Sequence, residues 1–331
     1  LLITLYVVSD FGAVAVLDCD VLTWVLYTER NSRVVFEIGL LLLVAVLPLV
    51  AGIRWLRADE VSEYALDFNQ ITRRSLNVPS AIGSYLLYTM MAGVGAVFPA
   101  AVLIQWIVEG YTQSIEFISL LEPWVTTALY AVLASLLTVS IAIWVCWRIY
   151  RGAANRALLD TLVYLPSSLP GVLIGVGLLQ LVLGIKRSSS AAADVFGYFE
   201  MTGGILLVAY SMRFLAQAYA ALRPGFNRLD PQVDEAARSL GASELTIWRA
   251  IRIPGLAPSL AVALALTFLS VCKELPITLS LIPLEQKTLA YVIFDAQGEG
   301  ALPDVGLASF CLLTMILVMQ ACTQYWRRIY G

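Results

Sequence analysis

The sequence alternates between long apolar runs and short polar segments. Seven runs are long enough to cross a bilayer as a helix, which needs about 20 residues, and residues 1–17 form a partial run. None alternates apolar and polar residues as the strands of a membrane barrel do. A backbone exposed to lipid must satisfy its own hydrogen bonds, so the pattern predicts helices. The seven runs cover residues 36–56, 82–108, 124–147, 158–185, 202–222, 257–282 and 305–325.

The predicted fold class is therefore an all-α membrane protein, a polytopic helix bundle with about seven full spans plus a partial one. Pro166, Pro170 and Gly171 lie inside one run, where they would be costly for a soluble helix. Membrane bundles tolerate such residues, because small side chains let helices approach closely. Composition agrees, since 60% of the residues are hydrophobic and 14% charged, against about 25% charged in soluble domains.

Composition also limits the chemistry of the chain. It contains no histidine, the most common metal ligand and general base. Its five cysteines lie far apart in the sequence, which gives no pattern typical of a metal or redox site. We therefore expect them to be small, buried hydrophobic residues. The net charge of −3 gives no basic stripe for nucleic acid. The sequence therefore predicts no catalytic site, no confident metal site and no nucleic-acid partner, whereas membrane lipid is an expected partner.

The distribution of Lys and Arg predicts the orientation. If the longest polar segment, 223–255, faces the cytoplasm, 14 of the 21 Lys and Arg residues lie on that side and 5 on the other. The remaining two, Arg213 and Lys273, lie within apolar runs. Because cytoplasmic loops carry the excess of positive charge, we expect segment 223–255 and the C-terminus to be cytoplasmic.

Segment 223–255 contains signals for two short helices. Asp230 can cap a helix that begins with Pro231. Gly241 can end this helix in a left-handed conformation. Ser243 can cap a second helix, which Pro254 is expected to end. The segment is thus predicted to be a helix–turn–helix outside the membrane, with an apolar face that another surface should cover.

This segment resembles the cytoplasmic coupling loop of bacterial ABC importer permeases. The family pattern is Glu-Ala-Ala, three residues, Gly, nine residues, Ile, two residues and Pro. The resemblance implies a type I importer permease fold, and a loop that docks on a separate ABC ATPase, as a dimer, which binds ATP and Mg. Gly241 would set the angle between the two helices, and Glu235 would contact the ATPase or brace the loop. The matching residues are Glu235, Ala236, Ala237, Gly241, Ile251 and Pro254.

A second resemblance concerns the substrate. The sequence Lys273-Glu274-Leu-Pro276-Ile-Thr-Leu, followed by Lys287-Thr-Leu-Ala290, is similar to a signature of iron(III) permeases. These typically work with a periplasmic ferric-binding protein. Adjacent charges inside a bilayer are costly unless they face the bundle interior or a wet cavity, and Pro276 should break the helix there. We therefore expect Lys273, Glu274 and Pro276 on the translocation pathway; the alternative is an ion pair that only braces packing.

The segment around Asp10 suggests an internal repeat. Ser9-Asp10-Phe11-Gly12 resembles the counterpart of Glu274-Leu-Pro276 in the first half of these permeases, which adds Asp10 to the expected pathway. The chain, which begins with Leu, would then be part of a longer protein with about twelve spans. Its expected parts are the tail of a first unit, 1–57, a cytoplasmic linker, 58–80, and a second six-helix unit, 81–331.

The expected function is the permease subunit of an ATP-binding-cassette importer in the bacterial inner membrane. It would move Fe(III), delivered by a periplasmic binding protein, and would neither be an enzyme nor bind a cofactor. The same architecture serves importers of thiamine, polyamines or oxyanions, so these substrates stay open. A secondary transporter is the alternative from another class; it would favour intramembrane coupling carboxylates and often inverted repeats.

Overall fold

The computed structural model describes residues 77–111, 117–152, 155–188 and 190–330, with isolated positions between 21 and 48. Every regular element in the four continuous ranges is a helix. Six helical runs there are long and apolar enough to cross a membrane, which confirms the predicted class of membrane helix bundle. Run 1–17, with Asp10, and most of run 36–56 lie outside the described residues. The six runs are Val78–Gly110, Leu121–Tyr150, Gly171–Ser188, Gly204–Arg228, Glu244–Cys272 and Leu302–Trp326.

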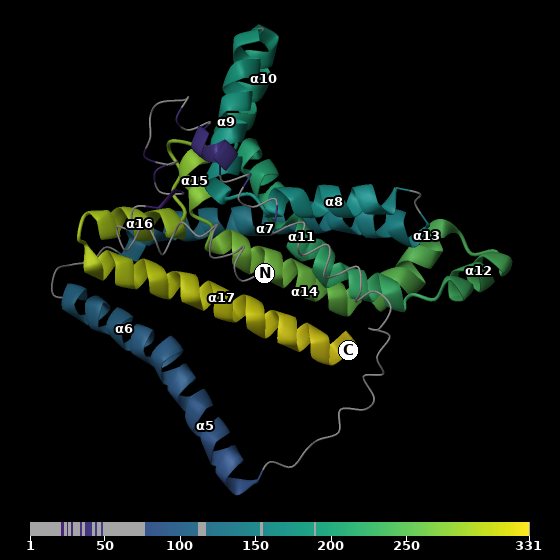
Figure 1. Cartoon of the computed structure of the whole chain (residues 1–331), viewed down its shortest axis with the longest axis horizontal. Coiled ribbons are helices and arrows are strands. Elements are labelled where there is room, and N and C mark those ends of the chain that lie inside the picture. The colour runs from purple at the N-terminus through teal and green to yellow at the C-terminus, as the bar shows by residue number, and fades with distance from the viewer. Residues whose placement is uncertain are drawn as a thin grey trace.

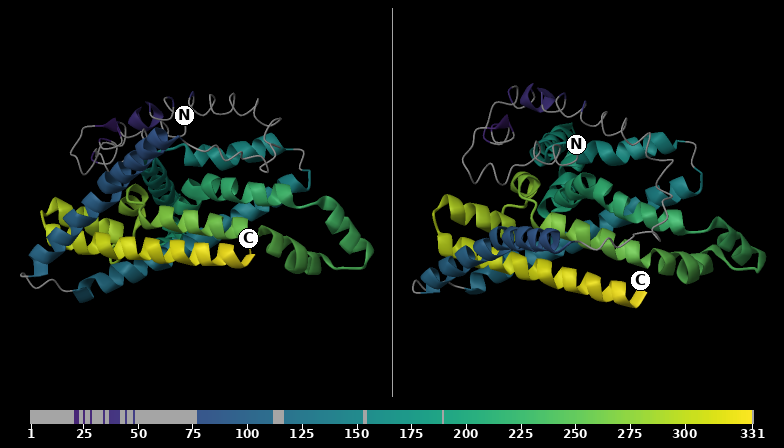
Figure 2. Two further views of the ribbon diagram at one scale, coloured as in Figure 1. Left: turned by 90° about the horizontal axis from the view of Figure 1, so that it is seen from below. Right: turned by 60° about the horizontal axis from the view of Figure 1, so that its bottom comes forward.

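The central layer consists of α7 (Leu121–Tyr150), α11 (Gly204–Arg228) and α14 (Ile253–Cys272), which lie side by side in Figures 1 and 2. Their contacts are rich in alanine, and six of these alanines have no exposed surface. Small side chains allow the close helix approach on which packing inside a bilayer depends. The six are Ala131, Ala134, Ala142, Ala209, Ala218 and Ala263.

A long helical run lies on the far side of α17 (Leu302–Tyr330), which itself packs against α14. The run consists of α5 (Val78–Ala92), a π-helical turn and α6 (Phe98–Tyr111), and α6 lies beside α17 in Figure 1. Gly306 on α17 makes the approach possible, because a Cβ there would lie 3.1 Å from the Leu103 carbonyl oxygen. Helix α5 has no buried residue. It begins at Val78, inside the segment 58–80 expected to be a linker.

The predicted span 158–185 is wrong, because two helices replace it. They are α8 (Arg156–Ser167) and α9 (Gly171–Ser188), and α9 turns away from the central layer in Figure 1. Pro170 lacks an N–H and disfavours helical backbone at the residue before it, so the helix breaks between the two. Helix α8 packs along α11, and α9 packs against α10 (Ser190–Met201).

The predicted span 257–282 is also interrupted, and here the prediction of a break at Pro276 is confirmed. Helix α14 ends at Cys272, and the short helix α15 (Pro276–Leu281) starts a new direction. The chain then continues through α16 (Leu289–Gly298) into α17. Helix α16 lies at the end of the molecule opposite α12 (Pro231–Ser239) and α13 (Glu244–Ile247) in Figure 1.

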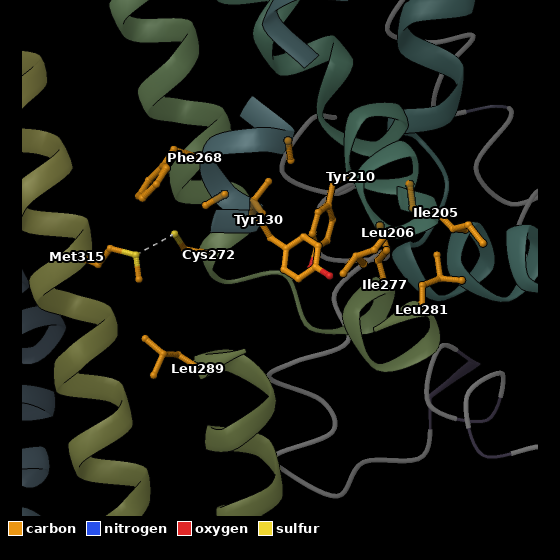
Figure 3. Packing of buried hydrophobic residues seen from close by; sticks show 14 of the residues in the cluster. Tyr130, Ile205, Leu206, Tyr210, Phe268, Cys272, Ile277, Leu281, Leu289 and Met315 are labelled. Atoms are coloured by element: carbon orange, nitrogen blue, oxygen red, sulfur yellow. Dashed lines mark hydrogen bonds between the residues drawn. The ribbon is translucent and has the colours of Figure 1, made fainter. Parts of the chain in front are cut away.

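The buried core continues around this break. Figure 3 shows Tyr130, Tyr210 and Ile277 close together between α7, α11 and α15. On the α17 side of the cluster, Cys272 Sγ lies 3.8 Å from Met315 Sδ. The core therefore joins α15 to the central layer and fixes the position of the break.

Candidate functional site

Helix α12 begins as the sequence predicts. The Asp230 carboxylate accepts a hydrogen bond from the backbone N–H two residues further on, at 2.9 Å, and Pro231 occupies the first turn. The predicted N-cap is thus confirmed. Of the Glu-Ala-Ala residues on this helix, Glu235 and Ala236 are exposed and Ala237 is half-buried.

Gly241 ends α12 in the left-handed conformation that the sequence predicts, with φ at 84°. The Ala242 N–H donates to the Ala237 carbonyl at 3.0 Å, and the Gly241 N–H donates to the Arg238 carbonyl at 2.9 Å. This pair of bonds is a Schellman motif, which satisfies carbonyls at a helix end. A Cβ at Gly241 would meet no heavy atom within 4 Å. Glycine is therefore favoured by the backbone angle and not by lack of space.

The second helix begins at its predicted cap but does not end where expected. Ser243 Oγ accepts a hydrogen bond from the Thr246 N–H at 3.2 Å. From α13 the chain continues through a π-helical turn, Trp248–Arg252, directly into α14. The prediction that Pro254 ends this helix is therefore wrong. Pro254 directly follows the π-helical turn, at whose end the Ile253 N–H donates to the Trp248 carbonyl five residues back.

The tip of this helix–turn–helix carries exposed apolar side chains. Leu240 is 89% exposed and Leu245 is 59% exposed. Of the apolar residues expected on the second helix, Leu245 is the exposed one, whereas Ile247 is buried and Trp248 and Ile251 are half-buried. Most of the predicted apolar face is therefore covered by the protein itself, and the exposed part is the tip.

Behind the tip lies a charge cluster that the sequence did not reveal, in which Arg252 and Asp234 are buried and Glu244 is exposed. Arg252 has no exposed surface, and its guanidinium donates to Asp234 Oδ2 at 2.7 Å and Glu244 Oε2 at 3.0 Å. It stacks on the rings of Trp147 and Trp248, 4.1 and 4.9 Å from their centroids. Trp147 is far away in the chain, and no local pattern links it to the loop. We call these five residues the Arg252 cluster.

An open pocket of about 590 Å³ borders the Arg252 cluster. Arg238 lines it and also donates to Glu244, 2.8 Å away. This hydrogen bond raises the pKa of the exposed Arg238 above its ordinary value, because it stabilises the charged guanidinium. The pocket is lined by Trp147, Tyr150, Arg151, Gly152, Pro231, Asp234, Glu235, Arg238 and Glu244.

The other predicted site residues lie at the break after α14. Lys273 is exposed, Glu274 is half-buried and Pro276 is buried. The Glu274 side chain lies at the N-terminus of α9, because a Cβ built on Gly171 would come within 2.6 Å of Glu274 Oε1. A helix N-terminus carries partial positive charge and favours a nearby carboxylate. The two breaks, at Pro170 and at Pro276, therefore meet at Glu274.

Helix α11 contacts both breaks. Tyr210 and Thr278 share a hydrogen bond of 2.5 Å between their hydroxyl oxygens. One turn along α11, Arg213 donates to the Ser167 carbonyl at 3.1 Å and also to the Leu169 carbonyl. One of these carbonyls belongs to the last residue of α8 and the other lies two residues beyond it, where the helix no longer satisfies them. The sequence showed that Arg213 lies within a span but not what it contacts.

The Lys287–Ala290 segment anchors α16 to α7. Thr288 Oγ1 caps α16 by accepting from the Tyr291 N–H at 3.3 Å, and the Leu289 N–H donates to Thr127 Oγ1 at 2.8 Å. Among the residues that the structure describes, no group of three or more His, Cys, Asp or Glu residues could hold a metal ion.

Comparison with known proteins identifies the family. Residues 139–330 match the model of the binding-protein-dependent transport system inner membrane component. The match covers more than half of the chain and includes the helix–turn–helix and the break at Pro276. The chain belongs to this family. Together with the six apolar helical runs of the described ranges, this makes it a multi-pass inner membrane component.

The curated relatives that this chain resembles are named for the transport of different substrates. The chain is 27% identical over 323 residues to the Fe(3+)-transport system permease protein FbpB 2 of Haemophilus influenzae, covering 92% of the chain and 60% of that relative. The chain thus spans less than two thirds of that protein's length. It is 27% identical over 197 residues to the Escherichia coli K12 molybdenum transport system permease protein ModB, covering 56% of the chain and 83% of ModB. It is 29% identical over 220 residues to the sulfate transport system permease protein CysT of Salmonella typhimurium, covering 62% of the chain and 77% of CysT.

Among solved structures, the inner membrane component is similar to a chain from a bacterial ABC transporter involved in the import of alginate. The TM-score is 0.48 at 15% identity, over 76% of this chain and 99% of that one.

Proposed function

We propose that the protein of which this chain is part is the permease of an ATP-binding-cassette importer. The observation that carries the proposal is the helix–turn–helix of α12 and α13, which projects from one end of the bundle with an apolar tip. This element continues without interruption into α14, which leads to the break at Pro276. A partner that moves the tip can therefore act on the membrane interior. Membership of a binding-protein-dependent transport family supports the same function.

The proposal assigns the energy source to another chain. ABC ATPase subunits, as a dimer, would bind ATP and Mg and contact Glu235, Ala236, Ala237 and Gly241. A periplasmic binding protein would deliver the substrate at the opposite end, near α16. The chain itself would bind no cofactor and catalyse no reaction.

For the substrate we propose Fe(III), because the relative named for Fe(3+) transport is similar over 92% of the chain. Fe(III) is a hard cation that prefers oxygen ligands. Within the break, Glu274 and the Thr278 and Ser280 hydroxyls provide few such ligands. We therefore expect the binding protein to select the substrate and the permease to provide a gated, weakly interacting route.

An oxyanion is the second candidate, because two relatives are named for molybdenum and sulfate transport. Two positive charges also lie within apolar runs of this chain, Arg213 in run 202–222 and Lys273 in run 257–282. Thiamine and polyamines stay open as substrates of the same architecture. A secondary transporter is disfavoured by the family match.

Uptake in cells that express the full-length parent protein tests the substrate. Radiolabelled Fe(III), molybdate, sulfate and thiamine are offered separately to cells with the wild-type protein or the Glu235→Lys variant. Loss of Fe(III) uptake alone in the variant supports the proposal. Loss of uptake of another compound alone retains the importer and overturns Fe(III).

Co-purification with the ATPase tests the docking surface independently of the substrate. Glu235→Lys should abolish co-purification, because it reverses a charge on the exposed face of α12. Glu299→Lys makes the same charge change on an exposed residue at the opposite end of the molecule and should leave co-purification unchanged. If Glu235→Lys co-purifies as the wild type does, the proposed docking surface is wrong.

A further inference from the structure

Helix α12 is held to the bundle by one buried side chain. All nine residues of α12 are described, and Asp234 is the one that is buried. Residues on its other faces are exposed or half-buried, including Glu235, Ala236 and Ala237. Apart from its covalent connections and the hydrogen bonds from the exposed Arg238 to Glu244 of α13, α12 is therefore linked to the bundle mainly through Asp234.

On the bundle side, the Asp234 carboxylate accepts hydrogen bonds from Arg252. The Arg252 Nε and one terminal nitrogen both donate to Asp234 Oδ2, at 3.1 and 2.7 Å, and its other terminal nitrogen donates to Glu244 Oε2 at 3.0 Å. The guanidinium is planar, and its donors leave it in fixed directions, unlike those of a lysine. Arg252 therefore fixes the directions of α12 and α13 relative to each other.

The same guanidinium also joins the loop to α7. Trp147, near the end of α7, lies with its ring centroid 4.1 Å from the Arg252 Cζ and 5.0 Å from the ring of Trp248. Trp147 in turn stacks on Tyr150 at 5.5 Å, and Tyr150 lies 6.2 Å from Phe226 on α11. The loop thus reaches α14 through the chain itself, but reaches α7 and α11 through these side chains.

Stability alone is a poor explanation for this arrangement. Removing charges from water costs several kcal/mol per ion, and apolar residues of similar volume often stabilise a protein as well as a buried ion pair does. A buried arginine with two carboxylates is more useful where a defined geometry has to be kept, because its hydrogen bonds have fixed directions.

We propose that Arg252 is a positioning residue that ties α12 to the end of α7, so that movement of α12 displaces α7 and α14 together. The inference rests on the proposed coupling function and adds a second route by which the loop acts on the bundle. Without Arg252, the ATPase would still dock on the exposed face of α12. Its movement would then reach α7 only indirectly, through the packing of α14 against it, and ATP hydrolysis would be poorly converted into import.

The test measures whether α12 and α7 move as one body. Spin labels are placed at Gln232 on α12 and Arg148 on α7, both exposed, in a cysteine-free form of the full-length protein with its ATPase subunits in lipid nanodiscs. Their separation is measured with and without bound ATP. In the wild type the separation should be the same in both states. In Arg252→Gln it should change or broaden when ATP binds.

Transport provides the second readout. Arg252→Gln should retain ATPase co-purification and ATP hydrolysis, while the substrate imported per ATP falls about tenfold, within the usual range of coupling between sites. Arg249→Gln is the matched control, because it removes the same charge from an exposed position on the same helical turn. It should behave as the wild type does.

The outcomes separate this inference from the proposed function. If the wild type does not co-purify with an ATPase, both fail. If it does, and Arg252→Gln keeps a constant label separation, the inference alone is overturned. Should Arg252→Gln fail to accumulate in the membrane, the same measurements are made on Arg252→Lys. This variant keeps the positive charge but lacks the planar guanidinium and its fixed hydrogen-bond directions. A constant separation in Arg252→Lys would then overturn the inference.

Discussion

Two glycines in the molecule are required for different physical reasons. Gly241 has a positive φ of 84° and open space around its Cα, whereas Gly171 has ordinary helical backbone and Glu274 Oε1 at the place of a Cβ. The first is a requirement of backbone conformation, and the second is a requirement of close packing. Substitutions that separate conformation from volume should therefore act differently at the two positions.

At Gly241, we expect Gly241→Val to disturb the loop and Gly241→Asn to be tolerated. A left-handed backbone costs about 1–2 kcal/mol for residues with a Cβ, and asparagine adopts it more readily than a β-branched residue. ATPase co-purification should therefore be lost in Gly241→Val and kept in Gly241→Asn. Loss in both variants would mean that the partner needs the open space at this position and not the backbone angle.

At the scale of elements, two interrupted helices determine the architecture of the membrane interior. The break between α8 and α9 and the break between α14 and α15 meet where Glu274 lies at the N-terminus of α9. Helix α11 braces both through Tyr210 and Arg213. Irregular backbone inside a bilayer is tolerated where protein buries it or water lines it, and transporters often place their binding sites at such breaks.

Two glycines on α9 test whether this meeting point matters for transport. Gly171→Ala should push the flexible Glu274 carboxylate away from the N-terminus of α9 and remove its favourable interaction with the helix, which is worth about 0.3–1 kcal/mol. Gly177→Ala is the matched control, because a Cβ there meets no heavy atom within 4 Å. It should stabilise the helix by about 0.5–1 kcal/mol.

The measurements are the thermal unfolding midpoint and the import rate of the full-length protein. We expect Gly171→Ala to lower both while ATPase co-purification is kept. If Gly171→Ala imports at the wild-type rate, Glu274 is not needed at the N-terminus of α9, and its predicted place on the pathway is weakened.

The elements that the sequence predicts well are those set by local chemistry. Asp230, Gly241 and Ser243 act on backbone groups within a few residues, so their caps could be identified from the pattern. Pro276 breaks its helix for a similarly local reason. Apolar length alone could not show that run 158–185 divides into two helices, because it does not distinguish a tolerated proline from a break.

Contacts between distant segments were not predictable from the pattern. The Arg252 cluster joins residues from α7, α12, α13 and the turn before α14, and Arg252 resembles any other charged residue of the loop until the fold buries it. The pattern also predicts that the helix ends at Pro254, because a proline usually ends or kinks a helix, and so it does not show that α13 continues into α14. The π-helical turn before it makes the continuation possible.

At the scale of the whole molecule, the two ends carry different proposed functions. The helix–turn–helix of α12 and α13 lies at one end, and α16 lies toward the other (Figure 1). The proposed importer requires the first end to face the ATPase in the cytoplasm and the second to face the binding protein. The distribution of Lys and Arg predicts the same orientation.

Two exposed leucines allow this orientation to be measured directly. Leu240 is 89% exposed at the end of α12, and Leu284 is fully exposed between α15 and α16. Each is replaced separately, Leu240→Cys and Leu284→Cys, in a cysteine-free form of the full-length protein. Cells with a permeabilised outer membrane are then treated with a maleimide that cannot cross the inner membrane.

We expect Leu284→Cys to be labelled in these cells, and Leu240→Cys to be labelled only after the inner membrane is opened. Because both side chains are exposed, a difference between them reports the side of the membrane and not burial. The reverse pattern would place the loop outside the cytoplasm, where ATP is not supplied, and would exclude an ATPase as its partner. Labelling of both in closed cells would instead mean that the number of spans between the two positions is even, and α14 could not then be the single span that joins them.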